Sequence, residues 1–453
     1  MSVRYDEDSL GKVEVPSEAY YGAFTARALK QYQVTGHASH PALRDSFVMI
    51  KRSAAIANMR TNSLDTVKGD AITQACDDIL NGNLTEWFVV DMINSGAGTA
   101  FNMNTNEVIA NAALRILGKN LGEYQHLHPN DHVNMSQSSN DTYPTAMHMS
   151  ILMGANKLMP ELNLLIRSLQ SKAEEFSKFR KIGRTHLMDA LPLTLGDEFA
   201  AYVVAVTKCT KLVQYTIKEL YPVALGGTAV GSGANTPDGY RSIVISELAN
   251  ISSLPLVMEP DMRHGLQSRF AAAAFSGALR GLAAELGKIS NDIRLMASGP
   301  MAGLSEIGIP AVHAGSSIMP GKVNPSLAEC MNMICYNVMG NDASVSMAAG
   351  AGQFELNVML PGMLKCILES TDMLYRFIPV FRANLIEGLT ANTARLQSDI
   401  QRSPVIVTLL APKIGYQKSA QLYKESLATG KTIRDLAISL NLMTADEVDE
   451  LLS

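Results

Sequence analysis

Long stretches of small and apolar residues at helical spacing are the feature that most restricts the fold of this chain. Residues 262–297 are rich in Ala and Leu, and similar helical patterns cover residues 149–179 and 327–345. We expect a break or kink near Pro160 and an interruption at Gly340-Asn341-Asp342. Side chains as small as Ala let helices approach closely, which favours helix–helix packing over a cofactor pocket. The sequence therefore predicts a mostly α-helical protein.

Length, charge and cysteine content narrow the class of protein. The 453 residues are enough for two or three domains with a large buried core. A net charge of −5 gives no reason to expect nucleic acid or an anionic membrane surface as a partner. No run reaches the roughly 18 apolar residues of a membrane span, and the N-terminus lacks an apolar signal core. Five cysteines without a C-x-x-C pair are typical of reduced thiols, so we expect a cytoplasmic protein.

Shorter helical patterns fill much of the remaining chain. Apolar residues recur at helical spacing over residues 46–60 and 71–80, and amphipathic pieces cover residues 432–439 and 444–452. The last hundred or so residues therefore predict a small helical domain. Near the N-terminus, residues 15–22 predict a turn followed by a packed pair of tyrosines.

One loop between the long helical stretches has a composition that suits ligand binding. It reads Gly315-Ser316-Ser317-Ile318-Met319-Pro320-Gly321-Lys322-Val323-Asn324-Pro325 and has no helical or strand periodicity. Its small residues let backbone N–H groups approach a carboxylate, and its hydroxyls, lysine and asparagine add further donors. An ordinary surface turn with a solvated lysine is the alternative.

Three further polar segments each allow a structural and a functional interpretation. Residues 95–107 place neutral donors near a helix N-terminus, which forms either an anion cradle or a capped helix start. Residues 135–142 are a run of hydroxyls and amides before a long helix, and N-cap chemistry explains only one or two of them. Residues 183–190 form a polar turn around His186, although a single histidine usually has a structural role.

Two other segments resemble ligand sites but do not fit them. Residues 126–132 hold three histidines and an aspartate, but Pro129 prevents a helical metal-binding face. The glycine-rich residues 225–233 have Ser232 where a phosphate-binding loop needs lysine, and no strand–helix unit surrounds them. We therefore expect neither a metal site nor a nucleotide cofactor, and we interpret the glycine-rich segment as a helix break that lets backbone approach the site.

The loop matches the pattern G-S-S-x-M-x-x-K-x-N in register, and the chain resembles the fumarase/aspartase superfamily through this and the three polar segments, in the expected order. The resemblance implies a mostly α, three-domain fumarase/aspartase-like fold with a long central helical bundle. It also implies a homotetramer with a twenty-helix core, and active sites shared between subunits. The expected domains are residues 1–136, residues 137–355 with the catalytic loop 314–325, and residues 356–453.

The resemblance also assigns roles to individual residues. It implies Ser316 as the catalytic base, with His186 and its partner Glu329 on the acid side. The implied substrate-binding residues are Thr99, Ser138, Ser139, Asn140, Thr185, Ser317, Lys322 and Asn324. A secondary anion pocket would involve His128, Asn130 and Asp131. No cofactor or metal is expected.

The reaction that the resemblance implies is elimination from a small dicarboxylate or amino-acid substrate. The motifs A-Y-Y-G at residues 19–22, G-A-G-T at residues 96–99 and G-L-T-A-N at residues 388–392 favour an aspartase, which releases ammonia from L-aspartate to give fumarate. Ser139 and Gly321 favour the alternative, fumarate hydratase. A third possibility is a lyase for a related amino-substituted succinate, and a fourth is a non-catalytic bundle protein that has kept the fold. The third is suggested by residues that replace the family's usual basic ones, namely Gln125, Met135 and Met301.

Overall fold

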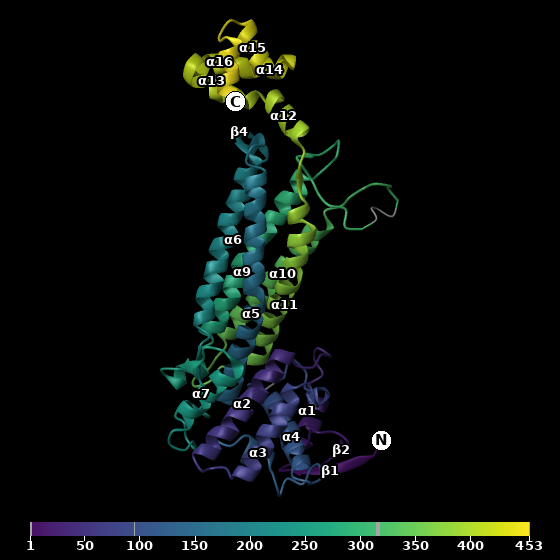
Figure 1. Ribbon diagram of the computed structural model, residues 1–453, viewed down its shortest axis with the longest axis vertical. Coiled ribbons are helices and arrows are strands. Elements are labelled where there is room, and N and C mark those ends of the chain that lie inside the picture. Colours follow the sequence, from purple (N-terminus) through teal and green to yellow (C-terminus); the bar gives the residue numbers. More distant parts are fainter. Residues whose placement is uncertain (1, 95, 314–317, 453) are drawn as a thin grey trace. The chain divides into compact units, whose positions relative to one another are not determined.

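The computed structural model describes residues 2–94, 96–313 and 318–452, which are mostly α-helical, as predicted (Figure 1). The α-helices are α1 (Ala23–Gln31), α2 (Pro41–Arg60), α3 (Thr66–Leu80), α4 (Thr99–Ile116), α5 (Ser139–Glu175), α6 (Leu195–Lys218), α7 (Tyr240–Ser252), α8 (Met262–Gln267), α9 (Phe270–Met296), α10 (Ser326–Ala349), α11 (Leu360–Asn384), α12 (Thr393–Arg402), α13 (Val407–Ile414), α14 (Tyr416–Thr429), α15 (Ile433–Ser439) and α16 (Ala445–Leu452). Short helical turns are η1 (Thr85–Trp87), η2 (Pro129–Val133), η3 (Ile386–Gly388) and η4 (Pro404–Ile406). The strands are β1 (Val3–Asp8), β2 (Gly11–Pro16), β3 (Arg180–Thr185), β4 (Met188–Thr194), β5 (Pro222–Val223), β6 (Val257–Met258), β7 (Ile307–Gly308) and β8 (Thr390–Ala391).

The long helices match the predicted patterns, but their ends differ. Helix α5 runs through Pro160 without ending, so the helix is not broken there, and the kink expected as the alternative stays a prediction. A proline inside a helix removes one backbone hydrogen bond, and tertiary packing of the flanking turns offsets that loss. The Ala/Leu-rich segment is divided into α8 and α9, because the helix stops at Ser268, whose hydroxyl accepts a hydrogen bond from the Phe270 backbone N–H.

Helix α10 also continues through its predicted interruption at residues 340–342. The polar side chains in this stretch are used for packing rather than for ending the helix. Asp342 accepts a hydrogen bond from Ser276 of α9 at 2.7 Å, and Asn341 donates one to Ser370 of α11 at 3.1 Å. Hydrogen bonds between helices therefore outweigh the local preference of residues 340–342 for a turn.

Contacts divide the chain into two compact units. Unit 1 comprises Met1–Pro160, Lys211–Ala283 and Tyr336–Tyr375. Unit 2 comprises Glu161–Thr210, Ala284–Cys335 and Arg376–Ser453. The three-domain division expected from the family stays a prediction.

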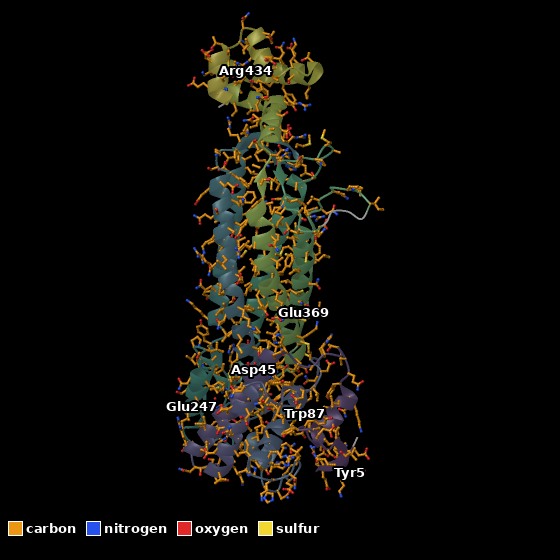
Figure 2. The ribbon with its side chains drawn as sticks, turned by 45° about the vertical axis from the view of Figure 1, so that its right-hand side comes forward. Tyr5, Asp45, Trp87, Glu247, Glu369 and Arg434 are labelled. Atoms are coloured by element: carbon orange, nitrogen blue, oxygen red, sulfur yellow. The ribbon has the colours of Figure 1, made fainter. Side chains whose placement is uncertain are left out.

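In unit 1, the N-terminal hairpin packs on α1. Strands β1 and β2 pair antiparallel, with Val3 opposite Pro16, and residues of β2 and α1 form a small apolar core. Trp87, labelled in Figure 2, lies beside Tyr20 and Tyr21, with ring centroids 6.2 and 6.1 Å apart. Each tyrosine of the predicted pair therefore packs against Trp87.

An aromatic cluster holds the starts of α4 and α5 together in unit 1. The ring of Phe47 on α2 packs edge-to-face with the ring of Phe101 on α4 and with the ring of Tyr143 on α5. The ring centroids are 5.3 and 5.6 Å apart, respectively. All three rings are fully buried or nearly so. Edge-to-face packing favours fixed ring orientations, so this cluster sets how the two helix N-termini approach each other.

In unit 2, the β3–β4 hairpin joins the core of the C-terminal helices. Its two strands pair antiparallel, and Ile182 of β3 packs with Ile406, Leu410, Leu422 and buried residues of α15 and α16. The helices predicted at the C-terminus are confirmed as α15 and α16 (Figure 1).

None of the helices in the described ranges combines the length and the apolar character that a bilayer span requires.

We predict that stability depends on pH through His148 of α5. Burial, assisted by the nearby Arg269 cation, lowers the pKa of His148 to about 4. The unfolded chain takes up this proton near pH 6.5, so the free energy of unfolding should fall as pH drops from 6.5 to 4, by about 3 kcal/mol in total. Urea unfolding at several pH values measures this loss. The His148→Gln variant, which can still hydrogen-bond the Pro222 carbonyl, should lack this part of the pH dependence; an unchanged pH dependence in that variant would contradict the assignment.

Candidate active site

Two hydroxyls predicted to bind substrate meet where two helices begin. Thr99 is the first residue of α4 and Ser139 the first of α5, and their side-chain oxygens are 2.8 Å apart. Both residues are half-buried. The first turns of two helices present backbone N–H groups and the positive ends of the helix dipoles, so this position favours a carboxylate without using a charged side chain.

Gly98, immediately before α4, is required by its surroundings as well as by its conformation. Its φ of 79° is left-handed, and a Cβ atom added there would lie 1.9 Å from the Tyr143 ring. Only glycine therefore fits between the start of α4 and the aromatic cluster. This close approach places Thr99 beside the first turn of α5.

A buried carboxylate fixes the turn that carries Ser138 and Asn140. Asp141 accepts hydrogen bonds from the backbone N–H groups of Ser138 at 3.0 Å, Gly226 at 3.1 Å and Thr228 at 2.8 Å. The Asn140 amide donates to the Ala229 carbonyl at 2.9 Å. Burial raises the pKa of Asp141 to about 7, against the lowering effect of these three donors. The glycine-rich segment thus lies against the turn that carries Ser138 and Asn140, so its backbone approaches these predicted substrate-binding residues.

A buried lysine fixes the preceding part of the same turn. Lys51 of α2 is completely buried, and its ammonium donates to Asn102 at 2.7 Å, Asn134 at 2.8 Å and Gln137 at 3.0 Å. Burial lowers the pKa of Lys51 to about 7. Its three protons are all used by amide oxygens, so it acts as a tether behind the site rather than as a surface charge.

Neither Lys51 nor Asp141 was identified from the sequence as a functional residue. The available signal was the position of Lys51 on the apolar face of residues 46–60, where it follows Phe47 by four residues. A charged residue on that face indicates a buried partner. Asp141 follows the three polar residues 138–140 in one polar run, but unlike those three it is fully buried.

His186 lies at the tip of the β3–β4 hairpin in unit 2. Thr185 pairs with Met188, so His186 and Leu187 form a two-residue turn, with φ angles of 57° and 61°. Two left-handed residues define a type I′ turn, which normally contains Asn and Gly. Bulky residues in this conformation are strained, and such strain is found where a side chain must point in a set direction. Thr185 and His186 are exposed.

Buried ion pairs hold the base of this hairpin. Glu306 is fully buried and accepts from Lys181 at 2.6 Å and from Arg184 at 2.6 Å. Lys181 also pairs with Glu198 of α6 at 3.0 Å. Buried charges need such partners, and their geometry fixes β3 relative to α6 and to the chain before β7. At the other strand, Ser403 donates to Asp189 at 2.6 Å.

The predicted catalytic loop is described only in part. Ser316 and Ser317 lie outside the described residues. Lys322 is exposed and Asn324 is half-buried, in the segment that leads to α10. The His313 imidazole and the Ser326 hydroxyl are 3.1 Å apart, which links the chain before the loop to the chain after it.

The predicted His186–Glu329 pair is not formed within one chain. Glu329 lies in the first turn of α10 and is exposed, and among the described residues no hydrogen bond or ion pair joins it to His186. If sites are shared between subunits, as the family resemblance implies, the partner comes from another copy. The pairing stays a prediction.

The predicted secondary anion residues form a helix cap beside a cavity. His128 Nδ1 accepts hydrogen bonds from the backbone N–H groups of Asn130 at 3.2 Å and Asp131 at 3.3 Å, at the start of η2. His128, Asn130 and Thr99 line one cavity of about 690 Å³ in unit 1. In the described part of the chain, no cluster of His, Cys, Asp or Glu could hold a metal ion.

Comparison with known proteins decides the family. A family model described as Lyase matches residues 11–340, and one described as Fumarase C C-terminus matches residues 406–453. The chain belongs to the fumarase/aspartase superfamily. The predicted family and fold are thereby confirmed, and the chain is an enzyme of the lyase family.

Relatives within this superfamily carry two different names at equal similarity. An aspartate ammonia-lyase of a Bacillus species is 42% identical over 451 residues, which cover 100% of this chain and 96% of the relative. A class II fumarate hydratase of Thermosynechococcus vestitus is 43% identical over 447 residues, covering 98% and 96%. Sequence identity therefore does not distinguish carbon–nitrogen from carbon–oxygen lyase activity.

Solved structures agree with the fold along the whole chain. A fumarate lyase:delta crystallin from Brucella melitensis bound to cobalt has a TM-score of 0.96 and 42% identity, covering 100% of this chain and 98% of the other. A class II fumarase from Schistosoma mansoni has a TM-score of 0.95 and 37% identity, with the same coverage.

We predict that Lys51→Met strongly destabilises unit 1. The substitution removes three hydrogen bonds from a buried ammonium and leaves the Gln137 amide oxygen without a donor among the described residues, so the free energy of unfolding should fall by about 3 kcal/mol. Urea unfolding at neutral pH measures the loss. Lys30→Met on the exposed side of α1 is the matched control and should change stability by less than about 0.5 kcal/mol. Equal effects of the two substitutions would show that the hydrogen bonds of Lys51 do not contribute measurably to the free energy of unfolding.

Proposed function

We propose that this enzyme eliminates ammonia from L-aspartate to give fumarate, reversibly. The observation that carries the proposal is the Thr99–Ser139 hydroxyl pair at two helix N-termini, an uncharged cradle suited to a carboxylate. The aspartase-like motifs at residues 19–22, 96–99 and 388–392 favour ammonia as the leaving group. Relatives named aspartate ammonia-lyase are as similar to this chain as those named fumarate hydratase, so the choice rests on these motifs.

The mechanism follows from the charge that elimination creates. Removing a proton from the carbon next to a carboxylate places a second negative charge on that carboxylate, so the site must bind the dianion better than the substrate. Hydroxyls and backbone N–H groups around Thr99 and Ser139 would hold this group. Ser138 and Ser317 would complete this cradle. Lys322 and Asn324 would anchor the other carboxylate.

The proton would pass to Ser316, and the leaving group would depart on the side of His186. A serine hydroxyl is a very weak acid, so an alkoxide at Ser316 needs neighbouring N–H groups and cationic charge. His186, oriented by Glu329, would act with Thr185 and Asn140 on the amino group. Closure of loop 314–325 would exclude water from the reacting atoms.

We further propose that the enzyme is a homotetramer whose active sites combine residues of different copies. The hairpin tip supports this, because Leu187 and Met188 are 72% and 70% exposed beside His186. Apolar side chains also remain exposed along the long helices, including Tyr215 on α6 and Met347 on α10. Such surfaces are typical of subunit interfaces. We place the enzyme in the cytoplasm and expect no cofactor.

Fumarate hydratase is the second candidate, favoured by Ser139 and Gly321 and by the relatives of that name. A lyase for a related amino-substituted succinate is the third, because Met135 and Met301 replace basic residues usual in the family. The cradle for a carboxylate serves all three, so only the leaving group separates them.

Supplying fumarate with and without ammonia tests the proposal directly. We expect the ultraviolet absorbance of fumarate to fall only when ammonia is present, with aspartate as the product. Formation of malate without ammonia would replace the proposal by fumarate hydratase. No consumption under either condition would leave the amino-substituted succinate lyase or a non-catalytic protein.

Ser316→Ala should abolish most turnover with whichever substrate is active. Loss of a general base lowers kcat by about 10²–10⁴-fold, while the substrate should still bind. Steady-state kinetics measure kcat and KM separately. Ser439→Ala, at an exposed position of α15, is the matched control and should leave both constants unchanged. Near-normal turnover of Ser316→Ala would remove this residue from the mechanism.

A further inference from the structure

The chain that leads into the predicted catalytic loop is anchored within unit 2. It starts at Glu306, the buried partner of Lys181 and Arg184. Strand β7 follows and pairs antiparallel with β8. Pro310 then packs against Gly388, at which an added Cβ atom would collide with the proline ring. The approach to the loop is therefore held in place as far as Pro310.

The chain that leaves the loop is anchored in the same unit by α10. Near the start of this helix, Asn332 donates to the Gly287 carbonyl of α9 at 3.0 Å and accepts from Arg294 of α9 at 3.2 Å. Ser326 is the first residue of α10 and is half-buried. The packing of α9 and α10 therefore sets the position of the Ser326 hydroxyl.

The described part of the loop forms a turn that ends at Lys322. The backbone N–H of Lys322 donates to the carbonyl three residues earlier at 3.3 Å, with Pro320 and Gly321 between them. Proline followed by a glycine with a φ of 77° is typical of a type II turn. The backbone N–H of Ser326 donates to the Asn324 carbonyl at 2.9 Å, which joins this turn to the start of α10.

One side-chain contact joins the two ends of the loop. The His313 imidazole Nε2 and the Ser326 hydroxyl are 3.1 Å apart. A hydroxyl both donates and accepts, so this hydrogen bond forms with either tautomer of the imidazole. Residues 311–313 are exposed, so packing contributes little to their position. A bond that holds the two ends together therefore removes conformational freedom that the loop would otherwise have.

We propose that His313 is a positioning residue, whose hydrogen bond to Ser326 orders residues 318–325 before substrate binds, so that Lys322 and Asn324 already stand where they anchor a carboxylate. The proposal rests on the proposed function of those two residues, which is the same for all three candidate reactions. His313 acts through the loop and not on the substrate.

The expected effect falls on substrate binding rather than on turnover. Without the hydrogen bond, part of the binding free energy must order the loop, so the apparent affinity falls. Once substrate is bound, the loop has the same structure in both proteins, and kcat should not change. A variant that merely folds poorly would behave in the opposite way, because less active enzyme lowers the measured kcat and leaves KM unchanged.

A double-mutant cycle tests the hydrogen bond with whichever substrate is active. His313→Ala and Ser326→Ala should each raise KM about fivefold, with kcat within about twofold of the parent. The double variant should resemble either single variant, because the same bond is lost. His313→Gln, whose amide can bond the same hydroxyl, should keep the parent's KM. Additive effects of the two alanine substitutions, or a fall in kcat at unchanged KM, would refute the proposal.

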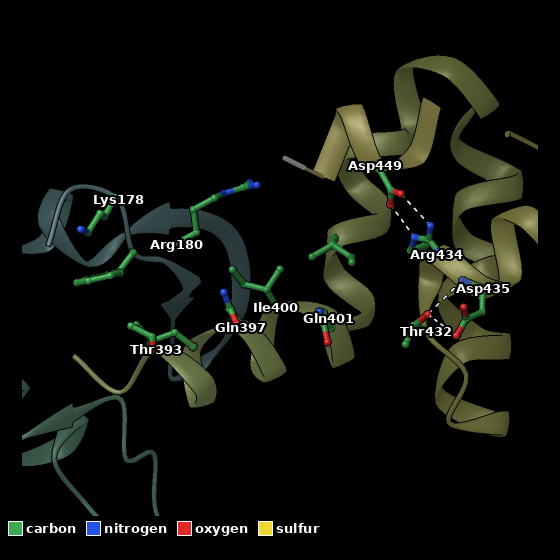
Figure 3. A pocket seen from close by; sticks show the side chains of 13 residues that line it. Lys178, Arg180, Thr393, Gln397, Ile400, Gln401, Thr432, Arg434, Asp435 and Asp449 are labelled. Carbon is green, nitrogen blue, oxygen red and sulfur yellow. Dashed lines mark hydrogen bonds and ion pairs between the residues drawn. The ribbon is translucent and has the colours of Figure 1, made fainter. Parts of the chain in front are cut away.

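Two matched controls should keep the parent's KM and kcat. His37→Ala removes an exposed imidazole of unit 1 that has no hydrogen-bond partner in the described part of the chain. Gln401→Ala alters α12, the helix that follows β8, at a side chain that lines a cavity between α12 and α15 (Figure 3). An equal rise in KM with either control would show that the effect is not specific to His313.

Two further measurements need no turnover. Succinate, a four-carbon dicarboxylate without a leaving group, should bind His313→Ala about fivefold more weakly than the parent in a calorimetric titration. Amide hydrogens of residues 318–325 should exchange faster in ligand-free His313→Ala than in the ligand-free parent. Unchanged exchange would refute the ordering role of His313. A parent that binds no succinate would instead contradict the proposed function of Lys322 and Asn324, and exchange would still decide whether His313 orders the loop.

Discussion

The turn that carries Ser138, Ser139 and Asn140 depends on two buried ionisable groups. Lys51 of α2 holds the chain leading into it through the amide oxygens of Asn134 and Gln137, and Asp141 joins it to the glycine-rich segment through the backbone N–H groups of Gly226 and Thr228. Burial disfavours both charges, which is why their pKa values shift towards each other. The costly charges thus lie behind the turn, and the turn carries the neutral side chains predicted to bind substrate.

That arrangement has a chemical advantage. Neutral donors that are already fixed stabilise the charge which develops in the transition state, without first attracting and holding other anions strongly. Hydroxyls that moved freely would have to be ordered during the reaction, and that ordering would raise the barrier. The rigidity of the turn therefore matters as much as the identity of its side chains.

The helical fold could be predicted because the spacing of apolar residues along a long segment identifies a helix. That spacing does not depend on which other elements the helix packs against. The interruption predicted at residues 340–342 is wrong because packing between helices outweighs the local preference of these residues, which remain helical. Strands β3 and β4 were not predicted, since a short hairpin with His and Leu in its turn lacks the usual Asn-Gly signal. Family motifs predict the residues of the candidate site, whereas Lys51 and Asp141 are recognisable only once their burial is known.

The hairpin that ends at His186 and Leu187 fixes the distance of the His186 imidazole from the base of the two strands. Successive residues of an antiparallel strand advance by about 3.4 Å and alternate between faces, so one residue inserted in each strand would carry the imidazole that far and reverse its direction. Buried ion pairs fix the base of the hairpin, and left-handed backbone fixes its end. The number of residues between Lys181 and His186 is consequently as constrained as the identity of the histidine. Most exposed turns tolerate insertions and deletions, but this one should not.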